Sequence, residues 1–310
     1  MIKNELPHLL DIESLSASEI IALMDEADGF VQDLSQEKST IDERCRDKVL
    51  INAFFEDSTR TRVSFEMAAH RLGLRVINWT AAGSSASKGE DLSDTLANLG
   101  AMSPDVLVMR HGEYKAPYTA ASLVGCPVVN GGDGWRAHPS QALLDAVTMR
   151  QVLGDLKRRR IAICGDIAHS RVARSNLALL SKLGAELHVV APEALMPREK
   201  DLPEGVTCFD NLKDGLSGCD IVMCLRIQKE RMAAGLVPDP NDFHAEFGLN
   251  YDSLAYANDG AYVMHPGPMN RGVEIDPVLA DDPQRSLVLR QVRNGVAMRM
   301  AILKRALLRD

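Results

Sequence analysis

The sequence predicts an α/β protein with two doubly wound parallel-sheet domains, joined by interdomain helices, and a C-terminal helix that packs back on the first domain. Its 310 residues suit two hydrophobic cores of about 150 residues each. Short apolar runs alternate with helical stretches along most of the chain, as in βα repeats. Conspicuous polar residues follow these runs directly, where the carboxyl ends of parallel strands bind ligands.

The first half contains four apolar runs that predict strands. The run at 49–55 is almost continuously apolar, as expected of a strand covered on both faces. Apolar residues at helical spacing follow it, and Gly73 is a natural end for that helix. The other predicted strands are 74–79, 106–109 and 127–130, and helices are expected near 91–102 and 117–124.

The pattern restarts after a long predicted helix at 139–153. Strands are expected at 160–164, 186–191, 220–225 and 261–264, and a closing helix at 289–308. We therefore expect a first domain of residues 1–150, to which the helix at 289–310 returns, and a second domain of residues 151–288.

Residues 55–62, Phe-Glu-Asp-Ser-Thr-Arg-Thr-Arg, connect the strand at 49–55 to its helix. Ser58 or Thr59 falls at the N-cap, where the first backbone N–H groups have no partner within the helix. These amides and the helix dipole favour a bound anion, and Arg60 adds positive charge. The segment therefore predicts a phosphate site, although an ordinary capped helix has the same local pattern.

Three polar residues follow the next strands. Arg110 immediately follows the predicted strand at 106–109. A glycine-rich loop after the predicted strand at 127–130 leads to His138 and Gln141 at the start of a helix. A histidine at a helix N-terminus tends to stay neutral, so it can donate one hydrogen bond to a carbonyl oxygen. The alternatives are that Arg110 is simply solvated and that the segment with His138 is a structural helix cap.

The polar loop that contains Ser84 and Lys88 is either a linker or a flap that covers a bound phosphate.

The second half offers cations suited to carboxylates. Arg171 follows the strand at 160–164, and Arg226 follows the strand at 220–225. Two guanidinium groups suit a dicarboxylate because each binds one carboxylate bidentately. The segment at 265–268 contains two prolines, so it predicts a rigid ridge of carbonyl groups. The loop at 164–171 lacks Gly-x-Gly-x-x-Gly, and the chain has no Walker A loop, which disfavours nucleotide binding.

Composition excludes several classes. The chain is 45% hydrophobic and 25% charged, and no apolar run approaches the roughly 20 residues that span a bilayer. The first residues do not resemble a signal peptide, so a cytoplasmic protein is expected. A net charge of −8 argues against general nucleic-acid binding. Six cysteines without a Cys-x-x-Cys pair are expected to be reduced, and no metal site is expected.

Taken together, the motifs closely resemble those of aspartate carbamoyltransferase catalytic chains, in the aspartate/ornithine carbamoyltransferase superfamily. The resemblance extends over essentially the full length. The segments that carry it, in chain order, are 58–62, 84–90, 109–111, 138–141, 226–231 and 265–268.

The resemblance implies transfer of the carbamoyl group of carbamoyl phosphate to L-aspartate, in pyrimidine biosynthesis and without a cofactor. It assigns Arg60, Thr61, Lys88, Arg110 and His138 to catalysis. The residues it assigns to carbamoyl phosphate are Ser58, Thr59, Arg60, Thr61, Ser84, Lys88, Arg110, His138, Gln141 and Pro266. Those it assigns to aspartate are Lys88, Arg171, Arg226, Gln228, Pro266 and Gly267.

In the family, the loop that corresponds to Ser84 and Lys88 comes from a neighbouring chain. The resemblance therefore implies a homotrimer whose active sites are shared between chains. Whether a regulatory chain or a dihydroorotase-like partner binds the trimer stays open, as does inhibition by nucleotides.

Two other functions are compatible with part of this pattern. Ornithine carbamoyltransferases share the phosphate motif but typically have His-Cys-Leu-Pro where this chain has His265-Pro266-Gly267-Pro268. A noncatalytic trimeric scaffold for another pyrimidine enzyme would not need so many cations placed after strands. Both features favour an aspartate carbamoyltransferase.

Overall fold

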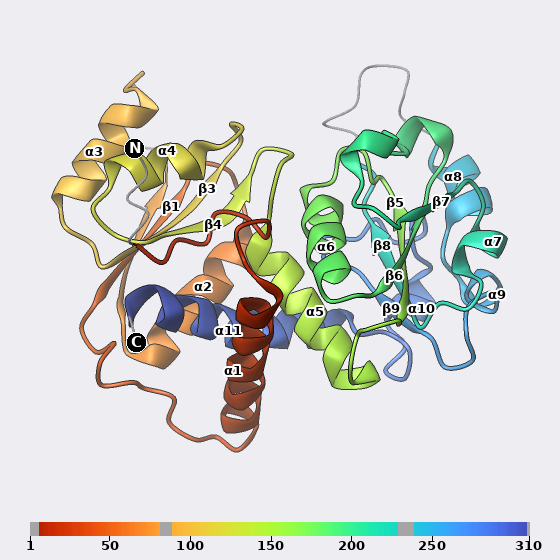
Figure 1. The fold of residues 1–310 in the computed structure, drawn as a ribbon, viewed down its shortest axis with the longest axis horizontal. Coiled ribbons are helices and arrows are strands. Elements are labelled where there is room, and N and C mark those ends of the chain that lie inside the picture. The colour runs from red at the N-terminus through yellow and green to blue at the C-terminus, as the bar shows by residue number, and fades with distance from the viewer. Residues whose placement is uncertain (1–5, 81–88, 229–238, 309–310) are drawn as a thin grey trace. The chain divides into compact units, whose positions relative to one another are not determined.

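The computed structural model describes residues 6–80, 89–228 and 239–308. The chain forms two compact units (Figure 1). The first consists of Met1–Val147 with Arg293–Asp310, and the second of Thr148–Val292. Each unit has its own parallel sheet, so the predicted α/β class with two sheet domains is confirmed.

The sheet of the first unit has the strand order β2-β1-β3-β4, and all its strands are parallel. Its strands are β1 (Val49–Phe54), β2 (Arg75–Thr80), β3 (Val106–His111) and β4 (Val128–Asp133). The chain passes from β1 to β2 in one direction and then returns to the other side of β1 for β3 and β4. The topological switch point therefore lies between β1 and β3, where open α/β sheets bind ligands.

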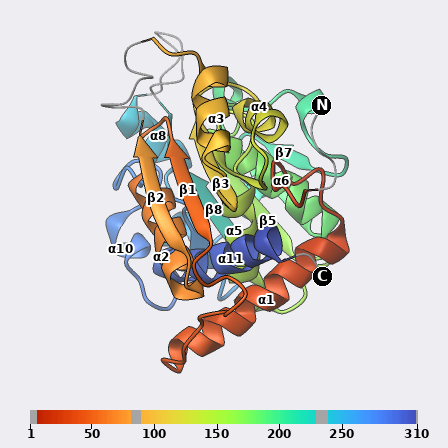
Figure 2. The same ribbon diagram turned by 90° about the vertical axis from the view of Figure 1, so that its left-hand side faces the viewer.

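Helices cover both faces of this sheet, α3 and α4 on one and α1, α2 and α11 on the other (Figures 1 and 2). Their bounds are α1 (Ala17–Ser35), α2 (Thr59–Leu72), α3 (Leu92–Ala101), α4 (Ala116–Leu123) and α11 (Val288–Leu307). Alternate strand residues such as Ile51 and Met109 pack with Leu96 and Ala120 in one buried cluster. Because helices cover both faces of the sheet, five of the six side chains of β1 are buried, which explains why this strand is nearly continuously apolar.

The C-terminal helix belongs mainly to the first unit, as predicted. Lys304 Nζ on α11 lies 2.6 Å from Glu26 Oε1 on α1. Arg305 Nη1 donates hydrogen bonds to the carbonyl oxygens of Pro7 and His8, at 3.4 and 3.3 Å. The last helix is thus tied to the beginning of the chain.

The sheet of the second unit has the order β7-β6-β5-β8-β9. Its strands are β5 (Arg160–Gly165), β6 (Glu186–Val190), β7 (Thr207–Phe209), β8 (Ile221–Leu225) and β9 (Tyr262–Met264). The chain moves from β5 to β7 and then returns beside β5 for β8, so the switch point lies between β5 and β8. The helices after β5 are α6 (Arg171–Lys182), α7 (Leu212–Leu216), α8 (Pro240–Phe247), α9 (Tyr251–Leu254) and α10 (Pro277–Ala280).

The predicted strands lie within a few residues of the observed ones, and α5 (Pro139–Leu153) has the predicted bounds. Several elements were not predicted: β7, α1 and the helices α7, α8, α9 and α10. β7 has three residues, of which Thr207 and Cys208 are exposed, so it forms no buried apolar run that would predict a strand. The helix α1 does carry a local signal, a capping box between Ser16 and Glu19, which sequence reasoning overlooked.

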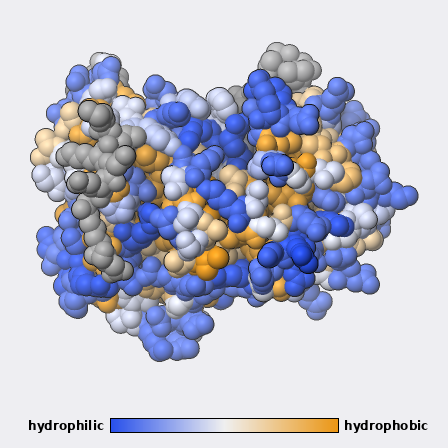
Figure 3. Space-filling view, in the orientation of Figure 1, coloured by the Kyte–Doolittle hydropathy of each residue, from blue (hydrophilic) through white to orange (hydrophobic). Residues whose placement is uncertain are grey.

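Most of the face shown in Figure 3 is hydrophilic, and the large apolar side chains lie largely in the two cores. Within the part of the chain that the structure describes, no helix has both the length and the apolar character to cross a membrane.

The cysteines allow a direct check of the fold. Five are buried, and only Cys208, on β7, is exposed. Burial raises the pKa of Cys126 and of Cys219 to about 12, so almost no reactive thiolate is present there at neutral pH.

We expect Ellman's reagent at pH 8 to modify one thiol per native chain quickly and all six after denaturation in detergent. The variant Cys208→Ser should lose the fast phase. Rapid modification of several thiols in the native protein would contradict the packing of both sheets.

Candidate active site

The turn between β1 and α2 positions the predicted phosphate residues. Ser58, one of the two residues predicted for this position, is the N-cap of α2. Its backbone has φ −160° and ψ 88°. Its side chain makes no capping hydrogen bond. Thr61 is buried in the first turn, whereas Arg60 is exposed. A helix N-terminus without a side-chain cap can direct its first N–H groups and its dipole toward an anion.

Arg110 lies at the same edge of the sheet because β1 and β3 are neighbours. It is the register partner of Phe54, and its carbonyl accepts a hydrogen bond from the Phe55 N–H at 2.9 Å. Its guanidinium donates to the Gly131 carbonyl at 3.2 Å. Arg110 Nε also lies 3.5 Å from Glu56 Oε2. Sequence reasoning did not assign a role to Glu56, which stands in the quoted segment 55–62.

His138 and Gln141 lie at the beginning of α5. The His138 carbonyl accepts the N–H groups of Gln141 and Ala142 at 3.0 and 3.2 Å, so His138 occupies the N-cap position. Its side chain is buried. Gln141 Nε2 donates to Asp145 Oδ1 at 2.9 Å, which fixes the amide and leaves its oxygen as an acceptor. Asp145 was not predicted, although its position four residues after Gln141 on the predicted helix 139–153 is a signal for this contact.

These groups come together through the sheet. β4 pairs with β3, with Met109 opposite Asn130 and His111 opposite Asp133, so the loop to α5 starts beside Arg110. Burial lowers the pKa of His111. The carboxyl edge of the first unit therefore carries the N-terminus of α2, Arg110 and the loop that leads to His138.

In the second unit, a close approach of β5 and β8 fixes the position of the predicted carboxylate ligands. Gly165 has φ +112°, and a Cβ there would lie 2.5 Å from the Leu225 carbonyl oxygen, so only glycine fits. Ser170 caps α6 by accepting the Ala173 N–H at 3.1 Å. Arg171 is the first residue of α6 and is buried. Arg226 directly follows β8.

Gln228 is tied to the loop that follows β5. Its N–H donates to Asp166 Oδ2 at 3.2 Å, and its Nε2 donates to the His169 carbonyl at 3.1 Å. Asp166 also contacts His169 Nδ1 at 2.8 Å. The segments after β5 and β8 thus form one structure, which brings the regions of Arg171 and Arg226 together. No role for Asp166 or His169, both in the loop 164–171, was predicted from the sequence.

The segment 265–268 follows β9, the neighbour of β8. His265 is buried and its Nε2 lies 3.1 Å from Glu274 Oε1. Its Nδ1 accepts the Gly267 N–H at 2.9 Å. These contacts hold the backbone of Pro266 and Gly267 at the carboxyl edge of the second sheet.

Two predicted residues, Ser84 and Lys88, lie outside the described residues. Within the described ranges, no group of three or more His, Cys, Asp or Glu side chains is arranged to hold a metal ion.

Comparison with protein-family models shows two consecutive matches. Residues 7–151 match the carbamoyl-P binding domain of aspartate/ornithine carbamoyltransferase, and residues 157–306 match the Asp/Orn binding domain. The chain is 52% identical over 296 residues to the aspartate carbamoyltransferase catalytic subunit of Acidiphilium cryptum, covering 96% of this chain and 94% of the relative.

Solved structures give the same result. Aspartate transcarbamoylase from Trypanosoma cruzi, in complex with carbamoyl phosphate and aspartate, has a TM-score of 0.88 and 32% identity, and 97% of each chain is covered. Ornithine carbamoyltransferase from Pyrococcus furiosus has a TM-score of 0.85 and 26% identity, with 97% of this chain and 96% of that one covered. As the sequence motifs predicted, this chain belongs to the aspartate/ornithine carbamoyltransferase family.

Proposed function

We propose that the protein transfers the carbamoyl group of carbamoyl phosphate to the amine of L-aspartate, giving N-carbamoyl-L-aspartate and phosphate. The observation that carries this proposal is the same in both units: cationic side chains follow the strands that flank each switch point. Arg60 and Arg110 flank the one between β1 and β3, and Arg171 and Arg226 flank the one between β5 and β8. The name and substrates of the Trypanosoma cruzi relative support the same reaction.

The first unit suits carbamoyl phosphate. We assign the phosphate to the start of α2, with Ser58, Thr59, Arg60 and Thr61, and to Ser84 and Lys88. The carbamoyl oxygen is assigned to Thr61, Arg110 and His138. Gln141 accepts from the carbamoyl amide, since its Nε2 is already engaged by Asp145, and the Pro266 carbonyl is the second acceptor.

The second unit suits a dicarboxylate. Arg171 and Arg226 each bind one carboxylate of aspartate, and Gln228 and Lys88 add hydrogen bonds. The backbone of Pro266 and Gly267 places the amine. Closure of the two units over both substrates follows from this division, because each supplies half of the ligands.

Catalysis then follows from where charge develops. The neutral amine attacks the carbamoyl carbon, and negative charge builds on the carbamoyl oxygen. Arg110, His138 and Thr61 stabilise that oxyanion, and donors already in place lower the barrier most. The C–O bond to phosphate breaks, Arg60 and Lys88 stabilise the departing phosphate, and a phosphate oxygen accepts the amine proton.

The wider assignments are a homotrimer with shared active sites, a role in pyrimidine biosynthesis and a cytoplasmic location. The trimer is proposed because the family resemblance assigns Lys88 to the active site of a neighbouring chain. The ornithine alternative is less well supported, since the curated relative named above is an aspartate enzyme and this chain has Pro266 and Gly267 where ornithine enzymes typically have Cys and Leu.

Substrate choice is tested by incubating the protein with carbamoyl phosphate and either L-aspartate or L-ornithine. We expect phosphate release and a carbamoylated product, identified by mass, with aspartate only. Product from ornithine would preserve the phosphate site and overturn the roles of Arg171 and Arg226. A folded protein inactive with both amines would support the scaffold alternative.

The phosphate site is tested by Arg60→Ala. We expect turnover to fall about 10²–10³-fold, because a preorganised donor to the departing phosphate is lost. Arg71→Ala, at the other end of α2, is the matched control and should retain wild-type turnover. Near-normal steady-state kinetics for Arg60→Ala would remove this residue from the site.

Shared active sites are tested by mixing unfolded Arg60→Ala and Lys88→Ala subunits and refolding them together. Each mixed cyclic trimer then contains one site with both residues intact, so random mixing should restore up to about a quarter of wild-type activity. Mixing Arg60→Ala with Arg110→Ala is the control, because both changes affect the same half of a site. Equal activity in both mixtures would count against a site completed by a neighbour.

A further inference from the structure

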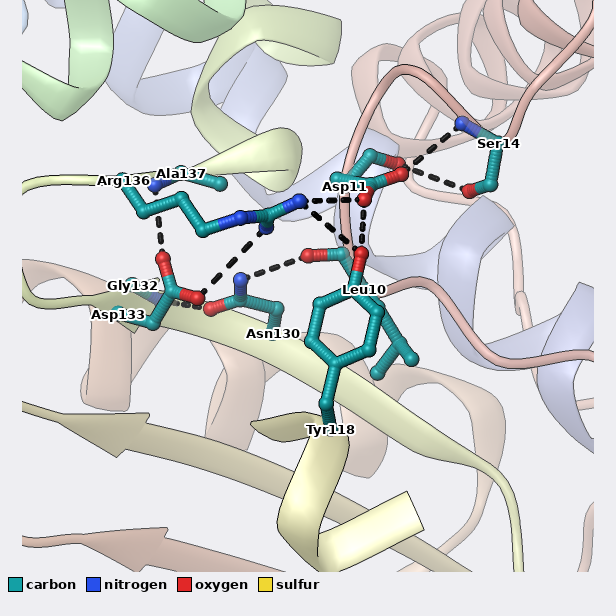
Figure 4. A network of polar contacts seen from close by, with 9 residues as sticks. All are labelled: Leu10, Asp11, Ser14, Tyr118, Asn130, Gly132, Asp133, Arg136 and Ala137. Carbon is teal, nitrogen blue, oxygen red and sulfur yellow. Dashed lines mark hydrogen bonds and ion pairs between the residues drawn. The ribbon is translucent and has the colours of Figure 1, made fainter. Parts of the chain in front are cut away.

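A buried polar network in the first unit joins the N-terminal segment to the loop before His138 (Figure 4). Arg136 Nη2 donates hydrogen bonds to Asp11 Oδ2 at 2.7 Å and to the Tyr118 hydroxyl at 3.0 Å. The Tyr118 hydroxyl donates to the same carboxylate, and the guanidinium lies 4.9 Å from the centroid of the Tyr118 ring. The side chains of Asp11 and Arg136 are only 6% and 15% exposed.

The segment that carries Asp11 is fixed independently of Arg136. The Leu9 N–H donates to the Val128 carbonyl at 2.9 Å, and the Leu9 carbonyl accepts from the Asn130 N–H at 2.8 Å. Asn130 Nδ2 also donates to the Leu10 carbonyl at 2.8 Å. This pairing with β4 makes Asp11 a firm anchor.

The loop that carries Arg136, residues 133–138, is closed by hydrogen bonds between Asp133 and Ala137. Asp133 Oδ1 accepts the Ala137 N–H at 2.7 Å, and the Asp133 N–H donates to the Ala137 carbonyl at 3.1 Å. Arg136 Nη1 lies 3.7 Å from Asp133 Oδ2. One guanidinium therefore bridges two buried carboxylates, and it does so two residues before His138.

The ion pair persists at neutral pH. Burial by itself would raise the pKa of Asp11, but hydrogen bonds from Tyr118, Arg136 and Ser14 outweigh it and lower the pKa. The carboxylate is thus charged, and removing Arg136 would leave buried charge that only a rearranged loop could solvate.

We propose that Asp11 and Arg136 are positioning residues for carbamoyl phosphate, because their ion pair holds the loop 133–138 so that the imidazole of His138 reaches the carbamoyl oxygen. The inference rests on the proposed function and extends it to residues that act through His138. Positioning matters at this point because an oxyanion donor works only where it is already in place, and a displacement of about 1 Å can cost on the order of 10²-fold in rate.

The first test is the variant Arg136→Gln in the full-length enzyme. We expect kcat per folded subunit to fall at least about tenfold, while KM for aspartate stays within about twofold. Arg136→Lys retains charge but not the planar fork, so its kcat should fall less. Lys304→Gln is the matched control, since it removes the 2.6 Å ion pair with Glu26 elsewhere in the same unit, and its kcat should be unchanged.

The second test separates positioning from stability. In a His138→Ala background, adding Arg136→Gln should lower kcat by no more than about twofold, because the two residues act through one contact. A purely structural role would instead lower the melting temperature and leave kcat per folded subunit intact.

Wild-type kcat in Arg136→Gln, or losses that multiply in the double variant, would overturn the inference. Should Arg136→Gln not fold, Arg136→Lys and Tyr118→Phe take its place, and wild-type kcat in both would have the same meaning. An inactive wild-type enzyme overturns the proposed function and with it the inference, whereas an active enzyme with unaffected variants overturns the inference alone.

Discussion

The structure depends on a constraint of parallel sheets, in which the carboxyl ends of all strands lie at one edge. Where the strand order reverses, the loops after two neighbouring strands run to opposite sides of the sheet and leave a crevice between them. In the first unit, the pairing of β1 with β3 sets Phe54 opposite Arg110, next to the start of α2. In the second, Gly165 packs against the Leu225 carbonyl and brings the loops after β5 and β8 together. The two parallel sheets thereby create the two edges at which we propose that the substrates bind.

Much of the fold and many of the candidate site residues could be predicted from the sequence, for physical reasons. A strand buried on both faces needs an unbroken apolar run, so β1 and β8 stand out. A helix that begins at a proline has a sharp start, which is why the bounds of α5 were predicted correctly. The polar residues after the strands were conspicuous because nothing in a buried strand or an amphipathic helix requires them there.

Other features depend on contacts between residues far apart in the sequence. Nothing local to Arg136 indicates Asp11, which lies 125 residues away. The hydrogen bond of Gln228 to Asp166 spans 62 residues and arises only once β5 and β8 are paired. Ser84 and Lys88 lie outside the described residues, so their roles and the trimer stay predictions that derive from the family resemblance.

Three of the groups proposed to bind substrate are each contacted by an acidic side chain. Glu56 lies against Arg110, Asp145 holds Gln141, and Asp166 holds the backbone of Gln228. In a site for anions, neighbouring cations would otherwise repel one another. Mobile amide groups would turn toward water. A carboxylate behind each group fixes its orientation before the substrate arrives, so less ordering is needed on binding. The Glu56–Arg110 contact differs from the other two, because Glu56 Oε2 lies 3.5 Å from Nε of a guanidinium that we propose as a donor to the carbamoyl oxygen. Under that proposal, the carbamoyl oxygen either accepts from another N–H group of Arg110 or displaces Glu56.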